Sequence, residues 1–239
     1  MIDKLGIGIM TSIKLKDRYM ACKNTWLSDF DNIFLFGGDS EDDNLIRLKN
    51  VGEDYNSCFL KQQLGLKYIY EKNDELDWYC MVGCDTILYK NNIIEELYKF
   101  NRDDDLFLGQ SNNHLVVNST KILAVAGGGG FFISNSLMRK IYPKISEFND
   151  TWKFLSDSNK LPVPYAIADI AIAYMIKIYF NIDLIHISGM FSQNPSKYVK
   201  SNNYCFLNDN DINRLNSPLS YHYIKPIEMN DIYNKYKKT

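Results

Sequence analysis

The chain has 239 residues, 46% of them hydrophobic and 14% aromatic. This is enough apolar material for the core of one large α/β domain or two small ones. The formal net charge is -2, from 27 Lys and Arg against 29 Asp and Glu residues. The basic excess that is typical of nucleic-acid-binding proteins is therefore missing, and we expect no nucleic-acid partner.

The cysteines and the N-terminal sequence bear on the cellular compartment. Five cysteines without a CxxC spacing argue against a structural zinc site or a disulfide scaffold and favour a reducing compartment. The first twenty residues carry charges too early for a secretory signal, and no apolar run is long enough to span a membrane. We expect a cytoplasmic protein or, alternatively, a luminal domain whose anchor has been removed.

The first part of the chain alternates between strands and helices. The apolar patterns predict strands over 5–11, 32–38 and 77–82 and helices over 17–27, 58–73 and 91–100, the last capped by Asn. Such alternation favours a parallel sheet that is covered on both faces. Ligands bind beyond the carboxyl ends of the strands in these sheets, which is where Thr11, Asp39 and Asp85 are expected.

The second part of the chain is less regular. The sequence predicts a strand at 103–110 after a solvated triple-Asp turn, a glycine run with a strand and helix over 126–142, a buried helix over 165–180, a strand over 182–187 and an extended segment over 220–226. The helix within 126–142 would be capped by Ser134 or Asn135. No repeat or low-complexity linker interrupts the chain, so we expect one continuous domain over 1–239.

Two carboxylates are candidates for chemistry. Asp85 follows Gly83 and Cys84 at the end of a buried strand, where it would be either a turn residue or a ligand for a divalent cation. Asp169 is the sole acid in the apolar stretch 165–180. It would either face solvent in the first helical turn or be buried, with a raised pKa that suits proton abstraction.

Other candidate residues are weaker when considered alone. His222 lies between aromatic residues in "SYHYI", and His114 and His186 have less promising surroundings. The glycine run Gly128, Gly129 and Gly130 would be either a hinge or a place where backbone approaches a substrate closely. No GxGxxG follows the first strand, which argues against a dinucleotide-binding oxidoreductase.

Five segments in order resemble a known family. They are "TSIKLKDRYMACKNTW" (11–26), "DWYCMVGCDTILY" (77–89), "GGGGFFIS" (127–134), "AIADIAIAYM" (166–175) and "SYHYIKPIEM" (220–229). This order resembles the inverting fringe and core-1 β1,3-galactosyltransferase group, glycosyltransferase family 31.

The resemblance implies a GT-A fold, with a mixed, mostly parallel sheet flanked by helices. It also implies transfer of a sugar from a UDP-sugar to a glycan or glycosylated acceptor, with inversion and a β1,3 linkage. Residues 1–110 would bind the nucleotide-sugar and residues 111–239 the acceptor.

The resemblance also assigns roles to single residues. Asp85 and His222 would bind a divalent metal, Mn²⁺ or Mg²⁺, on the diphosphate, and Asp169 would be the general base. Thr11, Arg18 and Asp39, together with Asp85, would contact the nucleotide. Gly128, Gly129 and Gly130 would form a substrate loop.

The chain departs from the family pattern at the acids that normally accompany Asp85 and Asp169. These positions are Gly83, Cys84 and Ala168. The departures suggest a bacterial or viral relative with weaker metal binding, and they keep a second hypothesis open, a degenerate protein that binds a nucleotide-sugar or glycan without catalysis. The loops 39–57, 110–120 and 190–215 would select donor and acceptor, with Tyr55, Trp152, Tyr198 and Tyr204 as candidates to stack on sugar rings.

Overall fold

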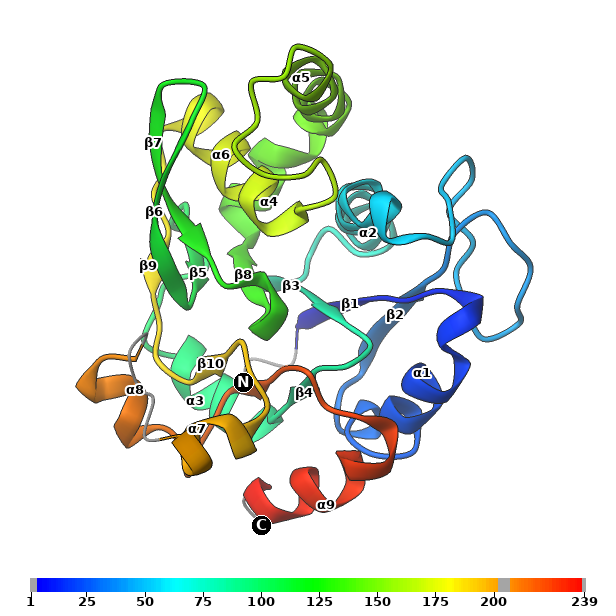
Figure 1. Cartoon of the computed structure of the whole chain (residues 1–239), viewed down its shortest axis with the longest axis vertical. Coiled ribbons are helices and arrows are strands. Elements are labelled where there is room, and N and C mark those ends of the chain that lie inside the picture. The colour runs from blue at the N-terminus through cyan, green and yellow to red at the C-terminus, as the bar shows by residue number, and fades with distance from the viewer. Residues whose placement is uncertain (1–3, 202–206, 238–239) are drawn as a thin grey trace.

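The computed structural model describes residues 4–201 and 207–237. Its centre is a six-stranded sheet in the order β2-β1-β3-β8-β5-β9 (Figure 1). The strands are β1 (Leu5–Met10), β2 (Asn32–Phe36), β3 (Trp78–Gly83), β5 (Phe107–Gly109), β8 (Phe131–Ser134) and β9 (Ile185–His186). Only β8 runs antiparallel to its neighbours within this sheet. The expected mixed, mostly parallel sheet flanked by helices is confirmed.

Two apolar layers cover the sheet, one on each face. Figure 1 shows the helices that form them. One face carries α2 (Cys58–Lys72), α4 (Asn135–Ile141), α5 (Ile145–Asp157), α6 (Ala168–Phe180) and the hairpin of β6 (Ser111–Val117) and β7 (Thr120–Val125). The other face carries α1 (Lys16–Lys23), α3 (Lys90–Leu97) and α9 (Pro226–Tyr236). As seen in Figure 1, the layer with α2 and α6 is the upper one and the layer with α1 and α9 is the lower one. Burial on both faces explains why the central strands are apolar almost throughout.

A small second sheet lies beside the lower layer, in the order β10-β11-β4. Its strands are β4 (Ile87–Leu88), β10 (Met190–Phe191) and β11 (Ser220–Tyr221). The remaining short elements are α7 (Pro195–Ser201), α8 (Asp209–Asn213) and 3₁₀ turns at Ile13–Leu15, Leu27–Asp29, Tyr55–Ser57, Gly127–Gly129 and Tyr142–Lys144. This small sheet joins residues near 88 to residues near 220, far apart in the sequence.

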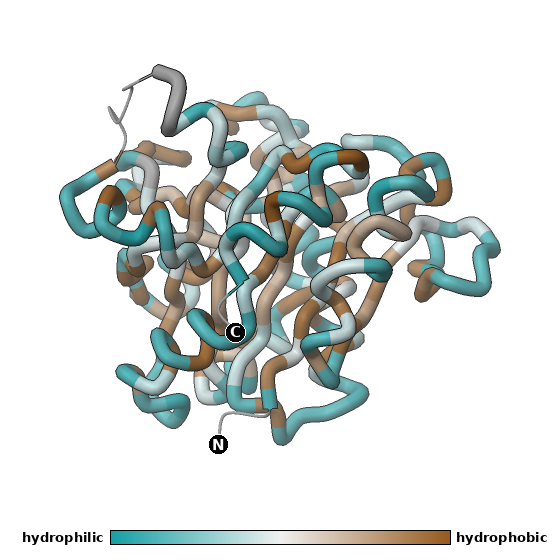
Figure 2. Tube along the Cα trace, turned by 90° about the horizontal axis from the view of Figure 1, so that it is seen from below, coloured by the Kyte–Doolittle hydropathy of each residue, from teal (hydrophilic) through white to brown (hydrophobic). Residues whose placement is uncertain are grey.

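Hydropathy follows these layers in space. Figure 2 shows hydrophobic segments through the middle of the molecule and hydrophilic ones around its outside. Within 4–201 and 207–237, no helix has the length and apolar character that crossing a membrane requires.

Several sequence predictions need correction. The segment 110–120 is largely part of the β6–β7 hairpin and not an open loop, and α5 and α9 were not predicted. The first helix ends at Lys23, and α3 begins without an Asn cap because its N-cap is Tyr89. Ser134, and not Asn135, caps α4 by accepting a hydrogen bond from the Leu137 backbone N–H. Cys205 and Tyr204 lie outside the described residues.

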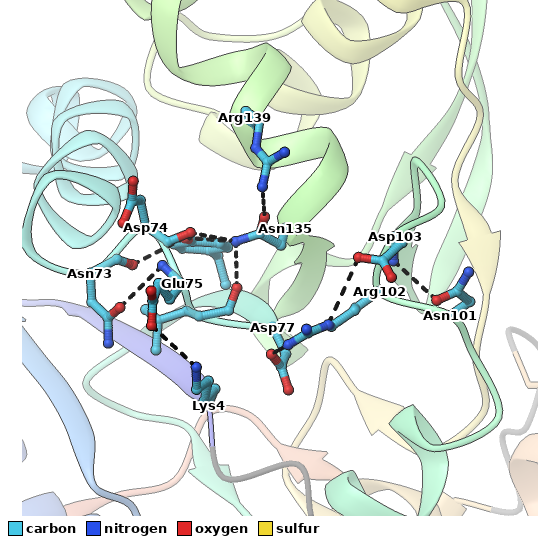
Figure 3. Close-up of polar contacts among 12 residues, drawn as sticks. Lys4, Asn73, Asp74, Glu75, Asp77, Asn101, Arg102, Asp103, Asn135 and Arg139 are labelled. Carbon is cyan, nitrogen blue, oxygen red and sulfur yellow. Dashed lines mark hydrogen bonds and ion pairs between the residues drawn. The ribbon is translucent and has the colours of Figure 1, made fainter.

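Asn135 instead organises the amino-terminal edge of the sheet (Figure 3). Its side-chain amide donates to the carbonyl oxygens of Asp74, at 2.7 Å, and Leu76, at 2.6 Å, just before β3. Its oxygen accepts from the Arg139 guanidinium at 3.0 Å. Nearby, Arg102 pairs with Asp77. The triple-Asp turn follows Arg102, so it lies at this edge, as expected, and away from the carboxyl ends of the parallel strands.

We expect Asn135→Ala to lower the free energy of unfolding by roughly 1–3 kcal/mol, because carbonyl oxygens buried at this edge lose their donor. Urea denaturation measures the change. Asn101→Ala, at an exposed turn of the same edge, is the control and should stay within about 0.5 kcal/mol of the parent chain. Equal urea midpoints for Asn135→Ala and the parent would contradict this role.

Candidate active site

Asp85 lies just past β3, at the carboxyl edge of the sheet, with a side chain that is 16% exposed. Its Oδ2 accepts from the Arg18 guanidinium at 3.0 Å, and its Oδ1 lies 3.2 Å from Nε2 of His222. Burial raises the pKa of the Asp85 carboxyl, but His222 and Arg18 lower it by more, and the net pKa is below its usual value. Asp85 is therefore an anionic centre held between two nitrogen side chains.

His222 reaches Asp85 through strand pairing. β11 runs antiparallel to β4, with Tyr221 opposite Ile87. His222, the residue after β11, therefore lies near the end of β3. The backbone N–H of Ile224 donates to the Asp85 carbonyl at 2.9 Å and secures this approach. This pairing explains why residues 137 positions apart meet.

The second ring nitrogen of His222 also has a partner. Nδ1 lies 3.3 Å from the carbonyl oxygen of Ser192, which can only accept a hydrogen bond. Nδ1 therefore carries a proton, and Nε2 faces Asp85 either as a second N–H or with a free lone pair. A backbone carbonyl that fixes the tautomer in this way is typical of histidines that bind metals.

The glycine run separates His222 from Asp169. Because β8 is antiparallel to β3, with Phe131 opposite Met81, the turn before β8 lies at the carboxyl edge. A Cβ on Gly128 would lie 2.1 Å from His222 Nδ1, and one on Gly127 would lie 2.2 Å from Asp169 Cβ. The backbone of the run therefore lies close to His222 and Asp169, and its close approach to a substrate stays a prediction.

The turn itself is well fixed. Thr86 Oγ1 donates to the Gly128 carbonyl at 2.9 Å, and Ser220 Oγ donates to the Gly129 carbonyl at 2.6 Å. Gly130 leaves the turn with φ +93°, a conformation that side chains other than glycine rarely adopt. Hydrogen bonds and close packing thus hold the run between His222 and Asp169.

Asp169 occupies the first turn of α6, which was one of the two predicted positions. Its side chain does not extend into solvent there but hydrogen bonds with backbone N–H groups. Oδ2 accepts from the Gly127 N–H at 3.0 Å, and Oδ1 accepts from the Ile170 N–H at 2.9 Å. Burial raises the pKa of this carboxyl despite these hydrogen bonds, which lower it, and the net pKa is above its usual value. Asp169 thus holds a proton more readily than an ordinary Asp.

Three further residues were predicted to contact the nucleotide. Arg18 lies in α1, and Thr11 and Asp39 follow β1 and β2. Arg18 contacts Asp85, as described above. Thr11 is only 3% exposed. The Asp39 carboxylate accepts from Arg47 Nε at 2.6 Å and from the Asn50 N–H at 2.9 Å, so its bonds are within its own loop.

A buried ion pair beneath this rim was not predicted from the sequence. Lys61 of α2 is 3% exposed, and its Nζ lies 2.7 Å from the Thr11 carbonyl oxygen and 3.7 Å from Glu53 Oε2. Glu53 Oε1 accepts from the Gly38 N–H at 2.8 Å, and Oε2 accepts from the Ile13 N–H. The pair therefore ties the loops after β1 and β2 together. In the sequence, Lys61 resembles any polar residue of an amphipathic helix.

The three departures from the family pattern have structural counterparts. Cys84 is 2% exposed in the lower core, and burial raises the pKa of its thiol to about 11, so it stays neutral. Ala168 is likewise buried in the upper core. A Cβ on Gly83 would lie 2.8 Å from Asp85 Oδ1. In this structure the side chains at 84 and 168 face apolar cores, so a carboxylate there would be costly to bury.

Other candidates lie elsewhere. Trp152 and Tyr198 are buried, so the expectation that they stack on sugar rings is wrong. Tyr55 is 66% exposed. His186 hydrogen bonds with Ser111 and faces the buried Asp211, an arrangement separate from Asp85.

The comparisons with solved structures concern the fold. The galactosyltransferase LgtC, solved with donor and acceptor sugar analogues, matches 98% of this chain and 97% of its own at TM-score 0.57 and 9% identity. A glycosyltransferase involved in glycosylation of the major capsid of PBCV-1 matches 96% of this chain and 99% of its own at TM-score 0.50 and 12% identity. GlyE of Streptococcus pneumoniae TIGR4 matches 93% of this chain at TM-score 0.55 and 10% identity, and the match spans 55% of GlyE.

Together with the sheet order and the site at its carboxyl edge, these similarities define a GT-A glycosyltransferase fold. No curated protein matches the chain in sequence. The model of one family, described as Fringe-like, matches residues 2–238. The chain belongs to the Fringe-like family, and the resemblance found in the sequence is confirmed.

We expect Gly128→Ala to move the His222 ring away from Asp85, because the new methyl group would overlap Nδ1. The chain has three histidines, so NMR signals of the ring protons can follow His222 directly. Gly37→Ala is the control, since the atoms nearest to its Cβ would be Leu45 Cδ1 at 3.2 Å, Leu45 Cβ at 3.4 Å and Glu53 Oε1 at 3.7 Å, and none belongs to His222. Unchanged His222 signals in Gly128→Ala would contradict the close packing.

Proposed function

We propose that the protein is an inverting glycosyltransferase that moves a sugar from a UDP-sugar to an acceptor hydroxyl and forms a β1,3 linkage. The observation that supports this best is the convergence of Asp85, His222 and Asp169 around one glycine turn. Residues 1–110 would bind the nucleotide-sugar, and residues 111–239 would bind the acceptor.

Asp85 and His222 fit a divalent cation, Mn²⁺ or Mg²⁺. Neighbouring ligand atoms at ~2.1 Å from an octahedral ion lie ~3.0 Å apart, and Asp85 Oδ1 and His222 Nε2 are separated by 3.2 Å. When bound, such an ion stabilises the charge of the diphosphate leaving group. No cluster of three or more His, Cys, Asp or Glu side chains suited to a metal occurs in the described ranges 4–201 and 207–237, so the diphosphate would complete the coordination.

Arg18 would add positive charge at the same place. Two unit charges ~4 Å apart interact by about 4 kcal/mol at an effective dielectric constant of ~20. The Arg18 side chain is 43% exposed, so solvent reduces its share well below that value. Thr11 and Asp39 would shape the nucleotide pocket through the loops that Lys61 and Glu53 hold together.

Asp169 would act as the general base on the acceptor hydroxyl. Its carboxylate accepts two backbone N–H bonds and retains lone pairs for a substrate proton. Burial raises its pKa, which brings it closer to the range useful for proton transfer. Direct displacement at the anomeric carbon inverts its configuration and needs no covalent nucleophile. One base opposite the leaving group is sufficient.

The alternative is a degenerate relative that binds a nucleotide-sugar or a glycan without turnover. The observation in its favour is the loss of acids at 83, 84 and 168. Incubation with a panel of UDP-sugars, oligosaccharide acceptors and Mn²⁺, followed by UDP detection and mass analysis, distinguishes the two. Transfer supports the first proposal. Binding of UDP without transfer for every donor and acceptor would support the alternative.

We expect Asp169→Asn to keep UDP binding and to lower transfer by about 10²–10⁴-fold, because the amide cannot take the proton. In the parent chain, the rate of transfer should fall as the pH is lowered through the raised pKa of Asp169, because a protonated carboxyl cannot act as a base. The ionisable side chains that interact with Asp169 are His222 and Tyr55. Initial rates across pH measure both effects. The matched control is Asp157→Asn, because this exposed acid pairs with Lys153 at the end of α5 and has no assigned role; retained turnover in Asp169→Asn would reject Asp169 as the base.

We expect Asp85→Ala and His222→Ala to remove the Mn²⁺ dependence of UDP binding, since either change leaves one protein ligand. Calorimetry with UDP, with and without Mn²⁺, measures this. His186→Ala is the control, because that histidine bonds to Ser111 elsewhere. If either site variant binds UDP and Mn²⁺ as the parent does, the metal assignment is wrong.

A further inference from the structure

Two tyrosines near the site are unusually exposed for their size. Tyr55 is 66% exposed and Tyr223 is 56% exposed. Tyr223 also has φ +58°, a left-handed conformation that is costly for a bulky residue and often marks a functional site. Neither residue contributes to the core, so packing of the fold does not explain why an aromatic ring stands at either position.

Tyr223 is held beside the proposed metal ligand. Its ring packs against the His222 ring at a centroid distance of 3.9 Å. Asn194 Nδ2 donates to the Tyr223 carbonyl at 3.3 Å and also bonds to Glu228 Oε2 at 3.2 Å, which anchors the strained backbone. The ring therefore presents an exposed face next to the catalytic edge.

Tyr55 begins the 3₁₀ turn that leads into α2. One turn later, Phe59 packs edge-on against Tyr165 at 5.3 Å, and Tyr165 lies just before α6, whose first turn holds Asp169. This packing brings the beginnings of α2 and α6 together. Burial raises the pKa of the Tyr55 phenol, and Cys58, Asp169 and Tyr223 raise it further.

We propose that Tyr55 and Tyr223 form an aromatic clamp for the sugar ring of the acceptor and hold its hydroxyl at Asp169. This inference rests on the proposed function and narrows the acceptor to a glycan. A pyranose ring has an apolar C–H face that packs on an aromatic ring and hydroxyl groups at its edge. The clamp therefore rests on the two rings, one beside His222 and one just before α2, whose beginning packs against the segment that leads into α6 and Asp169.

The test compares ring removal with ring retention. Tyr55→Ala and Tyr223→Asn remove the rings, and Asn tolerates the left-handed backbone at 223. Tyr55→Phe and Tyr223→Phe keep them. Tyr98→Ala is the matched control: this tyrosine is 55% exposed at the end of α3 and lies four residues before Arg102 of the amino-terminal edge. The probes are free oligosaccharides ending in galactose, glucose or N-acetylglucosamine.

Two readouts are needed for each variant. Saturation-transfer NMR measures oligosaccharide binding in the presence of UDP and Mn²⁺, and steady-state kinetics give the acceptor KM, kcat and the rate of donor hydrolysis by water. We expect ring removal to weaken glycan binding and raise the acceptor KM about tenfold, equivalent to ~1.4 kcal/mol. UDP affinity and donor hydrolysis should be unchanged in Tyr55→Ala. The two Phe variants should bind glycan as the parent does, and Tyr98→Ala should match the parent in every readout.

Failure of the clamp and failure of the proposed function give different results. If the parent binds oligosaccharides that the ring-removal variants do not bind, the clamp stands even when no transfer is found. If the parent binds none of the probes, or if Tyr55→Ala and Tyr223→Asn bind them as the parent does, the clamp is wrong whatever the transferase activity. An absence of UDP release from any donor bears on the proposed function alone.

Discussion

The site depends on the antiparallel pairing of β11 with β4. This short ladder carries His222 across the carboxyl end of β3 and places its Nε2 3.2 Å from Asp85 Oδ1. Asp85 follows β3 of the large sheet, whereas His222 follows β11 of the small sheet. The contact between the two side chains therefore requires that the two sheets meet here. The two sheets are thus joined at the point where the nucleotide-sugar would bind, and any change that loosens the ladder separates the pair.

The glycine turn is the second constraint, because its residues have no side chains that would overlap Asp169 and His222. Asp169 and His222 contact the backbone of Gly127 and Gly128 so closely that no side chain fits between them. Hydrogen bonds from Thr86 and Ser220 hold the carbonyl groups of Gly128 and Gly129. The backbone of the turn is therefore fixed both by these bonds and by its packing against Asp169 and His222. The turn has an additional role, because its Gly127 N–H orients the Asp169 carboxylate. Backbone geometry therefore sets the separation between the proposed base and the proposed metal ligands.

The sequence predicted the parts of the fold that rest on local pattern. The buried strands around Ile7 and Val82 and the apolar helix containing Asp169 follow from composition and periodicity. It did not predict the β6–β7 hairpin, although its two strands are neighbours in the chain, or α9, which packs against the distant α1. Order along the chain led to Asp85, His222 and Asp169, but not to Lys61 or Tyr223. The importance of Lys61 lies in a contact 50 residues away, and that of Tyr223 in a backbone angle, and neither has a signature in one sequence.

The two carboxylates of the site have opposite environments, and this difference supports their separate roles. Burial acts on both, but Asp85 has Arg18 and His222 beside it, which bring its pKa below the usual value. Asp169 has backbone N–H partners and a more distant His222, and burial prevails. A carboxylate that stays ionised suits a cation, whereas one that takes up a proton more readily suits a base. Exchanging the roles would ask Asp85 to accept a proton while Arg18 and His222 hold its pKa below the usual value. The charges of the site therefore favour one assignment over the other, independently of family resemblance.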